Sequence, residues 1–214
     1  MILENGQTLL FTGDSITDCN RRRPIAEDWG FGDGYVSQVD SLLSNWYPER
    51  LIRIINTGNS GDRVVDLQKR WQTDVLDLKP DWLSIMIGIN DVWRYFDRAT
   101  DPDMVGIERY ETTYRKLLEQ TRPQLNGLIL MTPFYIEENP EEPMRKQMDD
   151  YGAVVKNLAN DFDAVFVDVQ GAYNEYLKYR PTQSLCSDRV HPGQTGHMVI
   201  ARAFLTAIGF EWNR

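Results

Sequence analysis

A serine, an aspartate and a histidine stand in this 214-residue chain in settings that suit nucleophilic catalysis. Ser15 follows Gly13 and Asp14 at the end of a short apolar run, and Asp188 precedes His191 by three positions in a polar stretch. At that spacing a carboxylate can bond one ring nitrogen and leave the other free as a base for a nearby hydroxyl. Serine needs such a base before it can attack an acyl carbon. The pattern therefore predicts acyl transfer.

An acyl-transfer site also needs hydrogen-bond donors for the oxyanion that develops on the substrate. The natural set is the Ser15 backbone N–H, the Gly61 backbone N–H and the side-chain amide of Asn90. A glycine suits this task because no Cβ blocks close approach to its backbone. Taken alone, Asn90 would be an ordinary turn residue. The second histidine, His197, falls inside an expected helix and is interpreted as structural.

The elements that must position these residues follow from hydrophobic periodicity. Five apolar runs predict strands, at residues 8–11, 51–56, 82–87, 128–131 and 165–169. Amphipathic stretches predict helices at residues 35–46, 64–78, 108–122, 144–162 with a candidate break at Gly152, 172–178 and 195–208. This alternation predicts one α/β domain over residues 1–214, with a parallel sheet covered on both faces. The polar clusters then lie at the carboxyl ends of strands, where such sheets bind ligands.

Composition limits the class of protein. The formal net charge of -9 disfavours nucleic acid and anionic membrane surfaces as partners. Two cysteines, Cys19 and Cys186, are too few for a disulfide framework, and no metal-ligand spacing is present. No apolar run approaches the length of a membrane helix, and no basic start precedes a signal-peptide core. We expect a soluble, cytoplasmic, globular protein.

Four sequence blocks together carry a family resemblance. They are Gly13-Asp14-Ser15-Ile16, Gly61, Gly88-x-Asn90-Asp91 and Asp188-x-x-His191. In this order and spacing they resemble the SGNH (GDSL) hydrolase superfamily, with Ile16 in place of the commoner leucine. The resemblance implies a flavodoxin-like, three-layer α/β/α fold with a parallel five-stranded sheet, and an esterase without metal or other cofactor. It also implies Ser15 as nucleophile, His191 as base, Asp188 as its orienting group, and Ser15, Gly61 and Asn90 as the oxyanion hole.

Longer segments look like the bacterial intracellular acetyl-xylooligosaccharide esterases. They span residues 13–19, 85–94, 131–137 and 188–192. This similarity implies removal of acetyl groups from short xylan fragments by a homo-oligomer. Asp14, Trp93, Arg94 and Tyr135 flank the site in sequence and are the candidate substrate-binding residues. Trp93 and Tyr135 would stack on a sugar ring or an acyl group, or they are ordinary core aromatics.

Two other functional classes stay open beside the acetylesterase. One is a lipase or acyl thioesterase for longer chains, and the other is a binding or assembly protein that has kept the fold without activity. The loops at residues 20–34 and 137–143 are charged and rich in Gly or Pro, unlike an apolar lid. These loops favour a short acyl ester on a carbohydrate over a lipid. The intact set of predicted catalytic residues disfavours the inactive protein.

Overall fold

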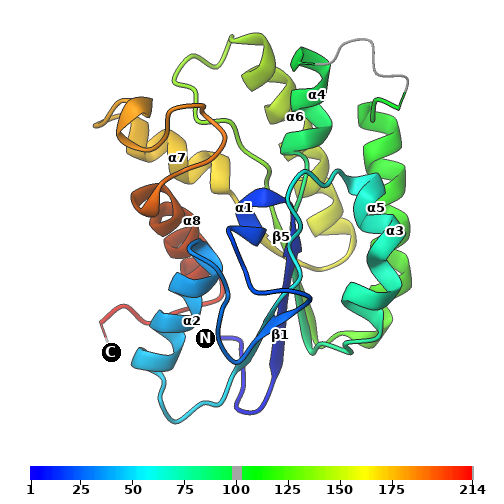
Figure 1. Cartoon of the computed structure of the whole chain (residues 1–214), viewed down its shortest axis with the longest axis vertical. Helices are drawn as coiled ribbons and strands as arrows, with labels where there is room; N and C mark the ends of the chain where they lie inside the picture. The colour runs from blue at the N-terminus through cyan, green and yellow to red at the C-terminus, as the bar shows by residue number, and fades with distance from the viewer. Residues whose placement is uncertain (98–102, 214) are drawn as a thin grey trace.

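One sheet of six strands organises the computed structural model, which describes residues 1–97 and 103–213 (Figure 1). The strands are β1 (Thr8–Gly13), β2 (Ala26–Glu27), β3 (Arg53–Asn56), β4 (Trp82–Met86), β5 (Gly127–Met131) and β6 (Val165–Val167). Their order across the sheet is β2-β3-β1-β4-β5-β6. The five longer ones pair in parallel, as predicted. The prediction of five strands in all is corrected by β2, a two-residue antiparallel edge on β3 within the expected loop.

Helices cover both faces of this sheet. They are α1 (Ser15–Asp18), α2 (Tyr35–Trp46), α3 (Val64–Trp71) with its π-helical continuation η1 (Gln72–Leu76), α4 (Ile89–Asp97), α5 (Ile107–Thr121), the 3-10 turn η2 (Arg122–Gln124), α6 (Pro143–Asp161), α7 (Val169–Leu177), the 3-10 turn η3 (Thr182–Ser184) and α8 (Gln194–Ala207). Figure 1 shows α2, α7 and α8 along one side of the sheet and α3 to α6 along the other. The predicted three-layer α/β/α architecture is confirmed.

Helix α4 was not predicted, although the signal for it is present. Apolar residues stand at Ile89, Val92, Trp93 and Phe96, the spacing of one helical face. Gly88, Asn90 and Asp91 favour a turn, so the sequence predicts a turn where the helix begins. The candidate break at Gly152 is wrong, because α6 runs through it without interruption. One helical glycine costs only about 1 kcal/mol relative to alanine, which the buried face of a 19-residue helix offsets.

Helix α7 begins earlier than predicted, and the strand before it is correspondingly shorter. Asp168 caps the helix by accepting a hydrogen bond from the Gly171 N–H at 2.7 Å. An aspartate cap satisfies an N–H group that lacks a partner within the first turn. The cap therefore ends β6 at Val167, whereas periodicity alone extended that strand by two residues.

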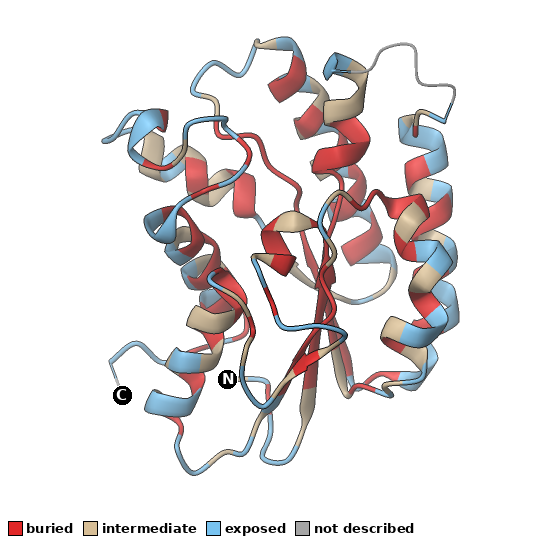
Figure 2. Cartoon of the chain, viewed as in Figure 1, coloured by how far each residue is buried: buried red, intermediate tan, exposed pale blue. Residues whose placement is uncertain are grey.

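The core lies on the sheet, and the polar residues gather at one edge of it. Figure 2 shows the central strands buried between helices whose outer faces are exposed. Parallel sheets covered on both faces carry continuous apolar runs, as β1 and β5 do here. The apolar character stops at the carboxyl ends of the strands, where Ser15, Gly61 and Asn90 follow β1, β3 and β4. No helix in the described part of the chain is long and apolar enough to cross a membrane.

Candidate active site

Ser15, His191 and Asp188 form a continuous hydrogen-bonded series. Ser15 Oγ lies 3.0 Å from His191 Nε2, and His191 Nδ1 lies 2.7 Å from Asp188 Oδ2. The other carboxylate oxygen, Oδ1, accepts the backbone N–H groups of Val190 at 3.0 Å and His191 at 2.8 Å. An ionised Asp188 accepts a hydrogen bond from Nδ1–H. This bond favours the tautomer in which Nε2 is unprotonated and faces the serine hydroxyl.

Asp188 stays ionised at neutral pH in this setting. Partial burial would raise the pKa of Asp188, but hydrogen bonds from the backbone and ring of His191 and from the Val190 N–H hold that pKa below its ordinary value. Hydrogen bonds made to the charged form of an acid favour that form. The carboxylate can therefore orient the imidazole and stabilise the imidazolium that forms when His191 takes a proton.

The position of Ser15 follows from a close approach of backbone at the end of β1. A Cβ on Gly13 would collide with the Met86 carbonyl and the Thr17 side chain, so glycine is required there. Asp14 then caps the short helix α1 by accepting the Ile16 N–H at 3.0 Å. This places Ser15 at the first position of α1, half-buried at the carboxyl edge of the sheet.

The turn Asn59–Asp62 brings Gly61 to the same edge. The Asp62 N–H donates to the Asn59 carbonyl at 3.2 Å, and Gly61 has φ +86, which a side chain would strain. The Asn59 N–H donates to the Gly13 carbonyl at 2.9 Å, which ties the turn to the strand that carries Ser15.

Asn90 lies in the first turn of α4, and its side chain is bound to the turn Asn59–Asp62. Its Nδ2 donates to the Asp62 carbonyl at 3.0 Å. A primary amide has two hydrogens on this nitrogen, so one remains for a substrate oxygen. Since β3 and β4 both neighbour β1, their carboxyl ends bring Gly61 and Asn90 to the edge where Ser15 lies. These three residues therefore lie at one edge of the sheet, and their shared role as an oxyanion hole stays a prediction.

The carboxyl groups of Asp14 and Asp91, which adjoin Ser15 and Asn90 in the chain, are buried. Burial, with a smaller contribution from nearby Asp62, raises the pKa of Asp14 to about 7. Burial raises the pKa of Asp91 to about 8, although its carboxylate accepts the Val64 N–H at 3.1 and 3.2 Å. Asp14 is only 1% exposed. The prediction that Asp14 contacts substrate does not fit this burial, because its carboxyl faces the interior and caps α1.

The remaining predicted substrate residues lie at different depths. The Trp93 ring is 5.9 Å from the His191 ring, centroid to centroid, at 58°. Arg94 Nη2 lies 3.4 Å from the Gly61 carbonyl oxygen. Tyr135 is buried, with its N–H bonded to Gln170 Oε1 at 2.8 Å, which fits the core interpretation better than stacking. Trp93 therefore borders His191, and Arg94 borders the turn that carries Gly61.

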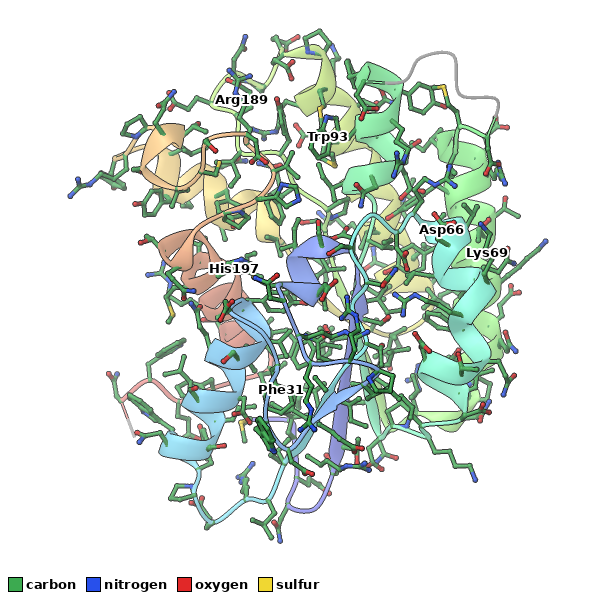
Figure 3. All side chains as sticks on the ribbon, in the orientation of Figure 1. Phe31, Asp66, Lys69, Trp93, Arg189 and His197 are labelled. Carbon is green, nitrogen blue, oxygen red and sulfur yellow. The ribbon has the colours of Figure 1, made fainter. Side chains whose placement is uncertain are left out.

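Arg189 is a structural residue of the site that sequence reasoning missed. It takes φ 65, the left-handed region, between Asp188 and His191. Its Nη1 lies 2.8 Å from Glu137 Oε2, and its carbonyl accepts the Ile136 N–H at 2.9 Å. Figure 3 shows Arg189 and Trp93 at the same end of the molecule. Arginine has no preference for this backbone conformation, so nothing in the sequence signalled it.

Within residues 1–97 and 103–213, no group of three or more His, Cys, Asp or Glu side chains is arranged to hold a metal ion. The chemistry available to the site is that of a serine hydroxyl, an imidazole, a carboxylate and amide donors. This set suits acyl transfer through a covalent serine intermediate.

Known proteins resemble the chain in sequence and in structure. The model of the GDSL-like Lipase/Acylhydrolase family matches residues 11–199. The acetylxylan esterase of Geobacillus stearothermophilus is 52% identical over 217 residues, which cover 100% of this chain and 99% of the relative. The crystal structure of that enzyme, Axe2, superposes with a TM-score of 0.98 at the same coverage. LAE5, an alpha/beta hydrolase enzyme from the metagenome of Lake Arreo in Spain, is 44% identical over 98% of both chains, with a TM-score of 0.96.

Substituted forms of the Geobacillus enzyme bear on the same residue types. Structures described as catalytic mutants of Axe2 replace a serine, an aspartate or a histidine by alanine. In that enzyme the aspartate precedes the histidine by three positions, the spacing of Asp188 and His191 here. A more distant relative, an uncharacterized lipoprotein named YqeF from Bacillus subtilis (strain 168), is 28% identical over 54% of each chain.

Proposed function

Because the chain belongs to the GDSL-like lipase/acylhydrolase family, we propose that it is a serine esterase that removes acetyl groups from xylo-oligosaccharides. Family membership agrees with the SGNH (GDSL) resemblance of the sequence blocks. The observation that carries the proposal is the series from Ser15 Oγ through His191 to Asp188, with distances of 3.0 and 2.7 Å. The relative that is 52% identical over the full chain is an acetylxylan esterase, which supports the acetyl group and the sugar acceptor.

The proposed reaction begins at Ser15. His191 Nε2 takes the hydroxyl proton while Oγ forms a bond to the acetyl carbonyl carbon, and the carbonyl electrons move onto its oxygen. Asp188 stabilises the imidazolium. The oxyanion collapses, the bond to the sugar oxygen breaks, and His191 returns its proton to that oxygen. Water then attacks the acyl carbon of acetyl-Ser15 while His191 takes its proton. The bond from Oγ to the acyl carbon breaks, His191 returns the proton to Oγ, and acetate leaves.

Three donors stabilise the oxyanion in this proposal: the N–H groups of Ser15 and Gly61 and the Asn90 amide. Each donor is held by a regular element or a closed turn, since Ser15 starts α1, Gly61 lies in a closed turn and Asn90 lies in the first turn of α4. Donors fixed in advance stabilise a developing charge without a reorganisation cost.

The surroundings of the nucleophile favour a sugar ester over a long acyl chain. An indole ring beside His191 offers an apolar face for a pyranose ring, and Arg94 beside Gly61 offers donors for hydroxyl groups. The lipase or thioesterase alternative needs a long apolar groove, and the full-length acetylxylan esterase match does not favour it.

The test is the dependence of kcat/KM on acyl length. A groove that buries each added methylene gains about 0.8 kcal/mol, or roughly fourfold, per carbon. We expect no such gain from nitrophenyl acetate through butyrate and hexanoate to octanoate, and turnover of acetylated xylo-oligosaccharides. A steady rise toward octanoate, with acetylated sugars untouched, would overturn the proposal. A fluorophosphonate adduct located by mass spectrometry on Ser60 instead of Ser15 would overturn the choice of nucleophile.

We further propose that residues 1–214 act as one domain in the cytoplasm. One sheet spans the described residues, and Cys19 and Cys186 are both free thiols, as is usual in a reducing compartment. The acidic net charge of -9 supports the absence of nucleic acid and membrane partners.

We also propose that the enzyme is a homo-oligomer with α7 and α8 in the interface. A groove of about 980 Å³ on these helices is lined by Tyr176, Tyr179 and Met198, and Tyr179 is 84% exposed. Exposed apolar patches of this kind mark interaction sites. The double substitution Tyr179→Asp and Met198→Asp should lower the mass measured by light scattering, and an unchanged mass would exclude this face.

A further inference from the structure

Asp18 joins the helix that carries Ser15 to the turn that carries Gly61. It ends α1, one helical turn after Ser15, and its side chain is 3% exposed. Its Oδ2 accepts both the Ser60 N–H at 3.0 Å and the Ser60 Oγ at 2.7 Å. Arg23 holds the same carboxylate with Nη1 at 2.9 Å and Nη2 at 2.5 Å. We propose that Asp18 is a positioning residue that aims the Gly61 N–H at the oxyanion, an inference that rests on the proposed function.

The turn geometry shows why Ser60 matters to Gly61. In the turn Asn59–Asp62, Ser60 and Gly61 are the two central residues, and φ +86 at Gly61 is the value of a type II turn. Type I and type II turns differ by about 150° in ψ of the first central residue and about 170° in φ of the second. A change from one turn type to the other rotates the peptide plane between Ser60 and Gly61 by about 180°. The turn type therefore decides where the Gly61 N–H points.

Asp18 fixes the residue on which this rotation depends. The earlier part of the loop is tied down separately, since Asn56 Nδ2 donates to the Thr17 carbonyl at 2.7 Å and the Asn59 N–H donates to the Gly13 carbonyl at 2.9 Å. Two hydrogen bonds from one residue to one oxygen hold both the backbone and the side chain of Ser60. Because Asp18 belongs to α1, both hydrogen bonds attach the turn that carries Gly61 to the helix that carries Ser15.

The charge of Asp18 strengthens this link. Partial burial would raise the pKa of Asp18, but hydrogen bonds from Arg23 and Ser60 lower it below its ordinary value. The group is therefore ionised at neutral pH, and bonds to an ionised acceptor are roughly twice as strong as neutral ones. Arg23 compensates the negative charge, so the carboxylate can lie near an oxyanion site without opposing it.

The first measurement is kcat and KM of Asp18→Asn on nitrophenyl acetate. Loss of an oxyanion donor lowers kcat by roughly 10²–10³-fold, and a misdirected donor should lower it by roughly 10–100-fold with KM within about threefold. Ser60→Ala removes one of the two bonds and should lower kcat by roughly 2–10-fold. Asp161→Asn is the matched control, because it also breaks an aspartate–arginine pair, with Arg115 at 2.7 Å. It should leave kcat within twofold.

Double substitutions separate positioning from general stability. The Gly61→Ala change meets no atom nearer than Arg94 Nη2 at 4.0 Å but strains φ +86, so it disturbs the same donor. In the Gly61→Ala background, adding Asp18→Asn should therefore lower kcat by less than about a further threefold. In the Asp188→Asn background, where the oxyanion hole still acts, adding Asp18→Asn should lower kcat by the same factor as in the wild type.

The inference would be overturned if Asp18→Asn lowered kcat by the same factor in the Gly61→Ala background as in the wild type. A wild-type kcat in the Asp18→Asn variant would also overturn it. If Asp18→Asn does not fold, the same comparison with Ser60→Ala decides. Retained turnover in Ser15→Ala would overturn the proposed function and this inference with it. An inactive Ser15→Ala beside a fully active Asp18→Asn would overturn this inference alone.

Discussion

The buried carboxyl of Asp14 should make the stability of the enzyme depend on pH, and Asp14→Asn should remove that dependence. Burial raises the pKa of Asp14 from 3.8 to about 7 in the folded protein. The folded state therefore binds this proton more tightly than the unfolded chain does. Stability from the protonated group is complete below about pH 3.8, falls as pH rises, and is lost once pH passes about 7.

The size of the effect follows from the width of this window. One pKa unit corresponds to about 1.4 kcal/mol, so a rise from 3.8 to about 7 corresponds to about 4 kcal/mol in the free energy of unfolding. An asparagine can accept the same Ile16 N–H that Asp14 accepts at 3.0 Å, and it carries no charge at any pH. Asp14→Asn should thus match the wild type near pH 4 and exceed its stability by as much as about 4 kcal/mol near pH 8.

The assay is urea unfolding of both proteins at intervals between about pH 4 and about pH 8, with Asp161→Asn as a control. Asp161 is exposed, so its substitution should shift stability by a similar small amount at every pH. Parallel wild-type and Asp14→Asn curves would refute the reasoning, because they would mean that Asp14 titrates alike in the folded and unfolded states. The KM of Asp14→Asn should also stay within about twofold. A large rise in KM would restore Asp14 as a substrate contact.

Three further outcomes are expected. Asn90→Ala should lower kcat by roughly 10²–10³-fold with little change in KM, and wild-type kcat would leave Asn90 with only its bond to the Asp62 carbonyl. Asp188→Asn should lower kcat by about 10⁴-fold. Trp93→Ala should raise KM for acetylated xylo-oligosaccharides by roughly 5–10-fold and leave nitrophenyl acetate within about threefold; equal effects on both would exclude stacking.

The fold was predictable where one local signal decided it. Helix α2 spans Tyr35–Trp46 as predicted, because its apolar positions recur at helical spacing and Pro48 prevents its continuation. The parallel strands were predictable from apolar runs with turn residues behind them. Helix α4 was missed because Asn90 and its neighbours are residues that favour turns. Here tertiary contact decides, since the Asn90 side chain is bound to the Asp62 carbonyl.

The candidate site was predictable where residue type and topology act together. Ser15, Gly61 and Asn90 follow three neighbouring strands, so their proximity follows from the strand order alone. The buried state of Asp14 was not predictable, because a Gly-Asp-Ser turn gives no sign of which side chain faces inward. The links made by Asp18 and Arg189 join residues that are distant in sequence, Ser60 and Glu137, and no local pattern encodes such pairs.

The two halves of the site lie in different electrostatic surroundings. The side chains of His191 and Asp188 are 46% and 40% exposed, whereas Asn90 is 7% exposed. Water screens charges at the exposed half, so Asp188 acts there mainly by fixing the orientation of the imidazole. Hydrogen bonds to a charge are stronger where water is excluded, so in the proposed reaction the buried Asn90 amide is the donor that gains most from its surroundings. In the proposed reaction, an open base beside half-buried Ser15 and Gly61 and buried Asn90 suits a polar sugar, whose hydroxyl groups can stay hydrated.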